Sequence, residues 1–198
     1  MTAGHFALAT GMKRGAPRLP LWVLMLSTYL LDIIFIVLFA AGVEGLTPID
    51  PGQPAHYGGV LIHAYYTHSL VGALLISSVA GLVGSRFWGR QGGMVIGAVA
   101  FSHWLLDLVV HRPDLPLLPD NWGNLPLLGL GLWAYPMVSM AIELGLIVIG
   151  AYLYYRSAAQ LPTAPGVDRQ RQQRQVLITT GGISLLLLLL LGADVLSL

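Results

Sequence analysis

Three ionisable side chains lie four residues apart in a stretch of sequence that is otherwise apolar. Within Gly93–Asp114 these are His103, Asp107 and His111. A spacing of four is slightly more than one helical turn, so the three side chains share one face of a predicted helix. An unpaired ionisable group at the centre of a membrane helix costs about 2.5–3.5 kcal/mol, and such groups usually face the protein interior. This stripe is the first candidate for a functional site.

His103 and Asp107 form the best candidate pair for holding a metal ion. At positions i and i+4 an imidazole nitrogen and a carboxylate oxygen can converge on one ion, and these ligands suit Zn, Mn or Fe. The alternative is a hydrogen-bonded pair that ties helices together. His111 lies about 12 Å along the helix from His103. It can join the same ion only if the helix unwinds, which the nearby Pro113 permits.

The composition is that of an integral membrane protein. Of the 198 residues, 56% are hydrophobic and 10% are charged, against roughly 25% charged in soluble domains. The mean hydropathy is +0.73. Cysteine is absent, so disulfides, thiolate ligands and cysteine nucleophiles are excluded, and a metal must use His, Asp or Glu. No basic patch or phosphate-binding glycine loop is present, and we expect no nucleic-acid partner.

Five apolar runs are long enough for membrane helices, which need roughly 20 residues each. They are Leu19–Ala41, Tyr57–Val83, Gly92–His111, Leu127–Tyr155 and Val176–Leu196. The sequence therefore predicts an all-α, multi-pass membrane protein built as a bundle of about five transmembrane helices. The predicted parts are a cytoplasmic tail (1–18), a four-helix core bearing the polar site (19–155), a cytoplasmic linker (156–175) and a fifth transmembrane helix (176–198).

The basic residues lie almost entirely on one side of this frame. Nine of the ten Lys and Arg residues precede the first run, or lie between the second and third or the fourth and fifth runs. The connecting segments of the other side carry Arg112 and several acids. By the positive-inside rule, the N-terminus is predicted to lie inside and the C-terminus outside.

Six ionisable side chains then fall at a common depth, in the outer half of the membrane. Asp32 lies beyond the middle of the first run, His63 and His68 near the start of the second, and the stripe near the end of the third. This convergence is the main reason to expect a single site. Thr67 and Ser69 flank His68 and can hydrogen-bond to it, so His68 is a better candidate ligand than His63, which can equally be a satisfied imidazole.

Three acids lie within the predicted membrane helices, namely Asp32, Asp107 and Glu143. Facing lipid unpaired, they would together cost roughly 8–10 kcal/mol. Asp32 could instead be neutral and protonated, and a structural role would explain Glu143 equally well. A divalent cation among the acids is a simpler account than several protonated histidines. Zn is the expected metal, with Mn or Fe as alternatives.

Several of these residues resemble the motifs of a known group of proteins. Asp32, the sequence THSL at Thr67–Leu70 and the sequence SHWLLD at Ser102–Asp107 are similar to elements of the predicted membrane-bound metal-dependent hydrolases. That group is linked to the zinc-dependent phospholipase C class. The continuations His111–Leu117 and Gly129–Trp133 resemble a subgroup of uncharacterised bacterial membrane proteins.

The resemblance covers residues 30–155 and implies four metal ligands: Asp32, His68, His103 and Asp107. It matches Glu143 to an acid of the subgroup. Many members have a proline before the first aspartate and another acid or histidine after it, whereas Leu31 and Ile33 stand there in this chain.

We therefore expect a metal-dependent hydrolase of a bacterial inner membrane, acting on a phosphoester or similar bond of a lipid-like substrate. A bound ion would lower the pKa of a water molecule and polarise the substrate oxygen. Glu143, or an aspartate that does not bind the ion, is the expected base, and His111 or Arg112 is expected to meet the anionic group of the substrate.

Two other functions remain open. The chain could be a non-enzymatic accessory subunit of a larger membrane complex that binds haem or chlorophyll through one histidine, which requires a broad apolar cavity around that residue. It could also carry ions or protons along its Asp and His residues. A carrier needs polar residues through the full thickness of the membrane, and the inner half of the predicted bundle has almost none.

Overall fold

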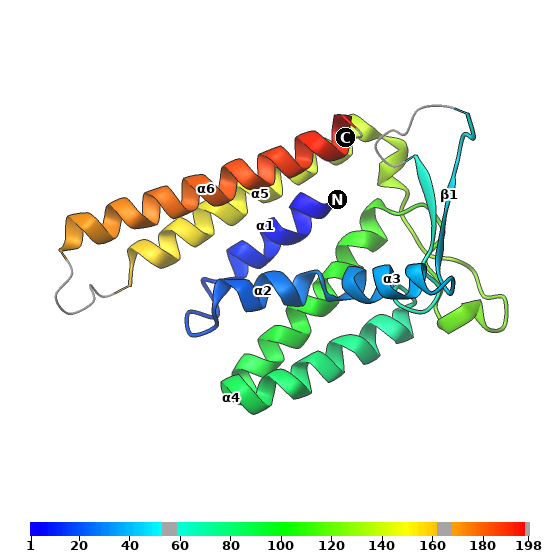
Figure 1. The fold of residues 1–198 in the computed structure, drawn as a ribbon, viewed down its shortest axis with the longest axis horizontal. Helices are drawn as coiled ribbons and strands as arrows, with labels where there is room; N and C mark the ends of the chain where they lie inside the picture. The colour runs from blue at the N-terminus through cyan, green and yellow to red at the C-terminus, as the bar shows by residue number, and fades with distance from the viewer. Residues whose placement is uncertain (53–58, 162–167, 197–198) are drawn as a thin grey trace.

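The computed structural model describes residues 1–52, 59–161 and 168–196, and over these ranges the chain is mostly helical (Figure 1). Within these ranges, three helices are long and apolar enough to cross a membrane: α4 (Leu70–Val110), α5 (Pro136–Ala159) and α6 (Arg169–Leu196). The bent pair α2–α3 passes the same test when taken together. The helical fold class is thus confirmed in its coarse form, with a small β-hairpin in addition.

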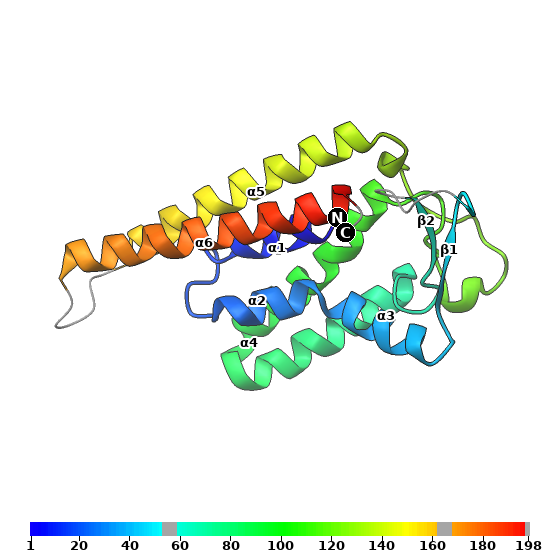
Figure 2. The same cartoon turned by 45° about the horizontal axis from the view of Figure 1, so that its top comes forward.

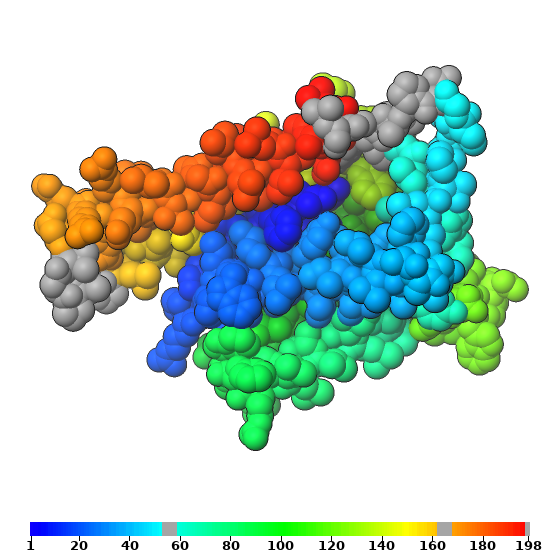
Figure 3. Space-filling model, viewed as in Figure 1, coloured from blue at the N-terminus to red at the C-terminus, as the bar shows by residue number. Residues whose placement is uncertain are grey.

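The first helix, α1 (Thr2–Met12), lies inside the bundle, where the sequence predicted a cytoplasmic tail over residues 1–18. Seven of its eleven residues are buried, and little of it shows between α6 and α2 in the space-filling view (Figure 3). The basic residues that suggested a tail begin only at Lys13, whereas Thr2–Met12 contains no acid, lysine or arginine and is rich in Ala and Gly. Small side chains let this helix approach its neighbours closely.

The closest approach of α1 is to α5. Gly150 lies against the backbone of Ala7 so tightly that a Cβ atom added at position 150 would collide with the Ala7 carbonyl group. Around this crossing, Ala3 and Ala7 pack with Ile147 of α5 and with Leu187 of α6. The contact between α1 and α5 is therefore made by backbone and small side chains, which a hydrophobic-periodicity argument does not detect.

The two described ends of the chain lie side by side (Figure 2). The amino nitrogen of Met1 is 3.8 Å from Oδ2 of Asp194 near the end of α6. The prediction that the N-terminus and the C-terminus lie on opposite sides of the bundle is therefore wrong. The physical reason is that α1 adds a helical segment of about 16 Å before the first predicted helix. This segment brings the start of the chain back beside the end of α6.

The predicted helix Leu19–Ala41 is broken into two. Helix α2 (Leu21–Thr28) and helix α3 (Leu30–Ala40) meet at Tyr29 with a bend of 49°. The last carbonyl groups of a helix have no partner within it, so the break makes the Thr28 carbonyl available to another part of the protein.

The segment before α4 is extended, where the second apolar run predicted helix. Strand β1 (Gly45–Pro48) pairs antiparallel with β2 (Val60–His63), and Tyr57 lies outside the described residues. Helix α4 begins only at Leu70, because the Ser69 hydroxyl caps it by accepting a hydrogen bond from the Gly72 N–H at 3.0 Å.

Helix α4 consists of two arms that fold back on each other (Figure 1). The chain reverses at Trp88 and Gly89, and Gly89 has a φ of +70° that favours glycine. The arms correspond to the second and third predicted runs, and the second arm ends at Val110, one residue before the predicted end.

The remaining helices differ from prediction mainly at their ends. The predicted helix Leu127–Tyr155 starts late, at Pro136, after the short 3₁₀ segments η1 (Pro119–Asn121) and η2 (Leu132–Ala134). The linker predicted over 156–175 is shorter, because α5 continues to Ala159 and α6 begins at Arg169.

Replacing Gly150 with alanine should destabilise the protein, because the added Cβ meets the Ala7 carbonyl. We expect a loss of about 1–3 kcal/mol, as for overpacking of a core, and a fall of several degrees in the Tm measured in detergent. Gly145→Ala on the same helix is the control, since its Cβ would meet no atom within 4 Å. Equal Tm values for the two variants would contradict this packing.

Candidate metal centre

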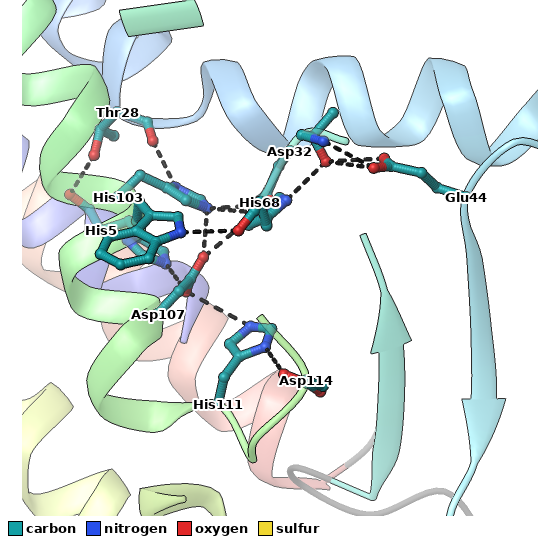
Figure 4. A network of polar contacts seen from close by, with 11 residues as sticks. His5, Thr28, Asp32, Glu44, His68, His103, Asp107, His111 and Asp114 are labelled. Atoms are coloured by element: carbon teal, nitrogen blue, oxygen red, sulfur yellow. Dashed lines mark hydrogen bonds and ion pairs between the residues drawn. The ribbon is translucent and has the colours of Figure 1, made fainter. Parts of the chain in front are cut away.

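Five ionisable side chains from separate parts of the chain point toward one another inside the bundle (Figure 4). They are His5 of α1, Asp32 of α3, His68 before α4, and His103 and Asp107 of the second arm of α4. The Asp32 side chain keeps 26% of its surface exposed, whereas the other four side chains are buried. Asp32 is therefore the member of the cluster that a molecule outside the bundle can reach.

The Nε2 atom of His103 lies at the centre of the cluster. It is 3.0 Å from Oδ2 of Asp107 and 3.3 Å from Oδ1 of Asp32. The Nε2 atom of His68 is 3.4 Å from each of the same two oxygens and 3.3 Å from Nε2 of His103. These four predicted ligands, which come from α3, α4 and the turn between β2 and α4, are thus brought together.

His5 is a fifth member that the sequence argument missed. Its Nε2 atom is 3.1 Å from Oδ1 of Asp107, and its ring stacks on that of His103 with the centroids 3.8 Å apart. Its Nδ1 atom is buried without a hydrogen-bond partner among the described residues. The sequence did carry one signal for this residue. His5 lies in a stretch of 11 residues, Thr2–Met12, that contains no acid, lysine or arginine.

Two overlapping groups of three residues have the spacing of metal ligands. His5, His103 and Asp107 form one, Asp32, His68 and His103 form the other, and within each group the ligand atoms lie within 4.8 Å of one another. His103 belongs to both, but its Nδ1 contacts the Thr28 carbonyl at 2.7 Å. Because only Nε2 remains to bind a cation, His103 can serve one ion at a time.

Three of the histidine rings are held by oxygen atoms at Nδ1. Nδ1 of His68 is 2.8 Å from the Thr67 hydroxyl, and Nδ1 of His111 is 2.8 Å from Oδ1 of Asp114. Together with the bond from His103 to the Thr28 carbonyl, each of these three rings has its Nδ1 on an oxygen and its Nε2 directed toward the cluster. Metal-binding histidines typically show this arrangement, because the partner of the second nitrogen fixes the ring and its tautomer.

His111 lies at the edge of the cluster. Helix α4 ends at Val110, and the extended backbone of His111 (φ −61°, ψ 146°) turns its ring back, so that Nε2 is 3.9 Å from Oδ1 of Asp107. The helix thus ends just before His111, and this is the unwinding that His111 needs in order to approach the site of His103. His111 is in neither ligand group, and its ring lies against Trp133 with the centroids 4.4 Å apart.

The other predicted residues occupy different places. Glu143 is fully buried, and its Oε1 accepts a hydrogen bond from the Gly4 N–H at 2.8 Å. This carboxylate therefore stabilises the free donors at the start of α1, and it belongs to neither ligand group. Arg112 is half-buried beside His111. His63 contacts the Thr47 hydroxyl at 2.9 Å, on the β-hairpin.

The cluster therefore offers three imidazole nitrogens and two carboxylates, a donor set that suits Zn and other first-row divalent ions. Comparison with protein-family models, with curated proteins and with solved structures finds no match to the chain.

Replacing Glu143 with alanine should destabilise the protein without changing metal binding. The variant leaves the buried Gly4 N–H without its carboxylate partner, which costs about 1–3 kcal/mol. Glu143→Gln keeps a carbonyl oxygen for this N–H and should retain most of the stability. Thermal unfolding and metal analysis of both purified variants would check this, and loss of metal from a folded Glu143→Gln variant would instead place Glu143 at the metal.

Proposed function

We propose that this protein is an integral-membrane, metal-dependent hydrolase that holds a divalent ion among His5, Asp32, His68, His103 and Asp107. The observation that carries the proposal is the direction of the ring nitrogens. Nδ1 of His68 and Nδ1 of His103 lie on oxygens of Thr67 and Thr28. With the ring protons on these Nδ1 atoms, the Nε2 lone pairs of the two neutral rings face each other across 3.3 Å.

Such an arrangement needs a positive charge at its centre. Two lone pairs and two carboxylate oxygens, all within 3.0–3.4 Å of His103 or His68, repel one another in a buried site, where unpaired charge is costly. A divalent cation satisfies all four groups at once. Zn is the metal that we expect, and Mn and Fe accept the same nitrogen and oxygen ligands.

The surroundings of Asp32 support a lipid-like substrate. Asp32 is the partly exposed ligand, and one turn further along α3 the side chains of Ile36 and Val37 are 55% and 62% exposed. A substrate that reaches Asp32 along this surface passes apolar side chains, which suits a molecule dissolved in the bilayer. The reaction that fits is hydrolysis of a phosphoester or similar bond at its polar head.

Within this proposal, an ion held by these five residues would supply an activated water molecule and polarise the substrate oxygen. Asp32, at the open side, holds the ion where the substrate arrives. We assign the contact with the anionic group to His111, which Asp114 and Trp133 keep in place, and to the neighbouring Arg112. This proposal gives Glu143 a structural role in place of the expected role as base, because its Oε1 accepts a hydrogen bond from the Gly4 N–H at the start of α1.

The proposed setting is a bacterial inner membrane, with the lipid bilayer as the surroundings. Nine of the ten Lys and Arg residues lie at the reversal of α4, in the loop after α1 or toward the facing ends of α5 and α6. These parts lie away from the β-hairpin (Figure 1). By the positive-inside rule this end is cytoplasmic, so the cluster belongs to the outer half. A haem or chlorophyll on His103 is less well supported, because polar atoms of Asp107, Asp32 and His68 surround its Nε2 at 3.0–3.3 Å, where a macrocycle needs a broad apolar cavity.

Metal analysis of the detergent-purified protein tests the metal site. The wild type should carry about one equivalent of Zn, Mn or Fe, and His103→Ala should lose it, because this variant removes the ligand common to both groups. His63→Ala is the matched control, since this imidazole lies on the β-hairpin. Absence of metal from the wild type, or equal metal in His103→Ala, would refute the proposal. A Soret or chlorophyll band would favour a cofactor-binding subunit of a larger complex.

Removing the metal should lower both stability and activity. A ligand present at a hundred times its dissociation constant stabilises by about 2.7 kcal/mol, so a chelator should lower the Tm by several degrees, and added Zn should restore it. Release of phosphate-containing head groups from phospholipid vesicles should show the same loss and recovery. Hydrolysis that persists in the fully metal-free protein would exclude the metal-dependent mechanism.

A further inference from the structure

A buried acid outside the cluster organises the segment that carries His68. Glu44 lies in the turn between α3 and β1 and is 5% exposed. Its Oε1 accepts hydrogen bonds from the backbone N–H groups of Tyr66 and Thr67, each at 2.8 Å. The Thr67 hydroxyl lies 2.8 Å from Oε2 and 3.1 Å from Oε1 of the same carboxylate. Glu44 therefore holds the chain immediately before α4 by three donors.

The direction of these hydrogen bonds determines which nitrogen of His68 carries the proton. A carboxylate only accepts hydrogen bonds, so the single hydroxyl proton of Thr67 is donated to Glu44. The Thr67 oxygen is then left as an acceptor, and Nδ1 of His68, 2.8 Å away, must donate to it. In the neutral ring this leaves Nε2 unprotonated, facing Asp32 and Asp107 at 3.4 Å.

We propose that Glu44 is a positioning residue that acts through Thr67 to keep the Nε2 atom of His68 free to bind the metal ion. This inference rests on the proposed metal-dependent function. His68 is more sensitive to such control than His103, whose Nδ1 faces a backbone carbonyl that is always an acceptor. Only the side chains of Glu44 and Thr67 set the direction of the hydrogen bond to Nδ1 of His68. A single substitution can therefore reverse this direction.

The substitution that tests the proposal is Glu44→Gln, which keeps the shape of the side chain. Its amide oxygen must take the Oε1 position, because two backbone N–H groups point there. The NH₂ group then takes the Oε2 position, 2.8 Å from the Thr67 hydroxyl oxygen, and donates to it. The hydroxyl proton turns to Nδ1 of His68 at 2.8 Å, which is nearer than the remaining acceptor at the Oε1 position, 3.1 Å away. The ring proton moves to Nε2, which removes the lone pair that would bind the ion.

The experiment is a titration of the metal-free protein with Zn²⁺ alone, in competition with a chromophoric chelator. Glu44→Gln should weaken binding by about 10–100-fold, the usual effect of losing a partner behind a metal ligand, while the Tm of the metal-free protein stays close to that of the wild type. Thr67→Ser keeps the hydroxyl and should bind as the wild type does. Asp120→Asn removes an exposed carboxylate and controls for the change of charge.

A double variant distinguishes an effect of Glu44 through Thr67 from a general weakening of the fold. Thr67→Val removes the hydroxyl, so adding Glu44→Gln to it should cause no further loss of affinity. Wild-type affinity in a folded Glu44→Gln variant, or additive losses in the double variant, would overturn the proposal.

Nitrogen-15 spectra of labelled histidines give a second readout that needs no metal. In the wild type, His68 should show its proton on Nδ1, and in Glu44→Gln on Nε2. If the wild type binds no Zn²⁺, the proposed metal function fails, and an unchanged His68 tautomer would refute the role of Glu44 separately.

Discussion

Three imidazoles and two carboxylates lie together in the interior of an otherwise apolar bundle, and the cost of burying these groups is the constraint on which the rest of the structure depends. Buried charge is tolerated only when it is paired and hydrogen-bonded. Each ring must therefore present the correct nitrogen, and each carboxylate must face it. Helices α1, α3 and α4 and the turn before α4 supply the ligands. Thr28 and Thr67 supply the oxygens behind the rings of His103 and His68.

The cluster lies where helices begin, end or break, and this location has a physical reason. Helix ends carry backbone groups without partners, and these groups are available to side chains. The break at Tyr29 frees the Thr28 carbonyl for His103, and the end of α4 at Val110 lets His111 turn back toward Asp107. At the start of α1, Glu143 satisfies a donor and so anchors the helix that delivers His5.

Close packing of small residues gives α1 its place, and through it the fifth member of the cluster. Ala7 against Gly150 brings α1 and α5 to backbone contact, and His5 lies on the same helix with its ring stacked on His103. The acid that controls His68 comes from yet another element, the turn at Glu44. The proposed metal function thus depends on residues that bind no ion themselves, because they decide the orientation of those that do.

The sequence by itself determined what depends on short spacing and on long apolar runs. The i, i+4 spacing of His103 and Asp107 brings them to 3.0 Å on one helix, and the hydrophobic runs correspond to α4, α5 and α6. The tertiary structure decided the places of His5, Glu44 and Glu143, the strand at Val60–His63 and the neighbouring chain ends. These features depend on contacts between residues far apart in the chain, made by backbone groups and small side chains. Such contacts leave no periodic hydrophobic pattern, so local sequence could not reveal them.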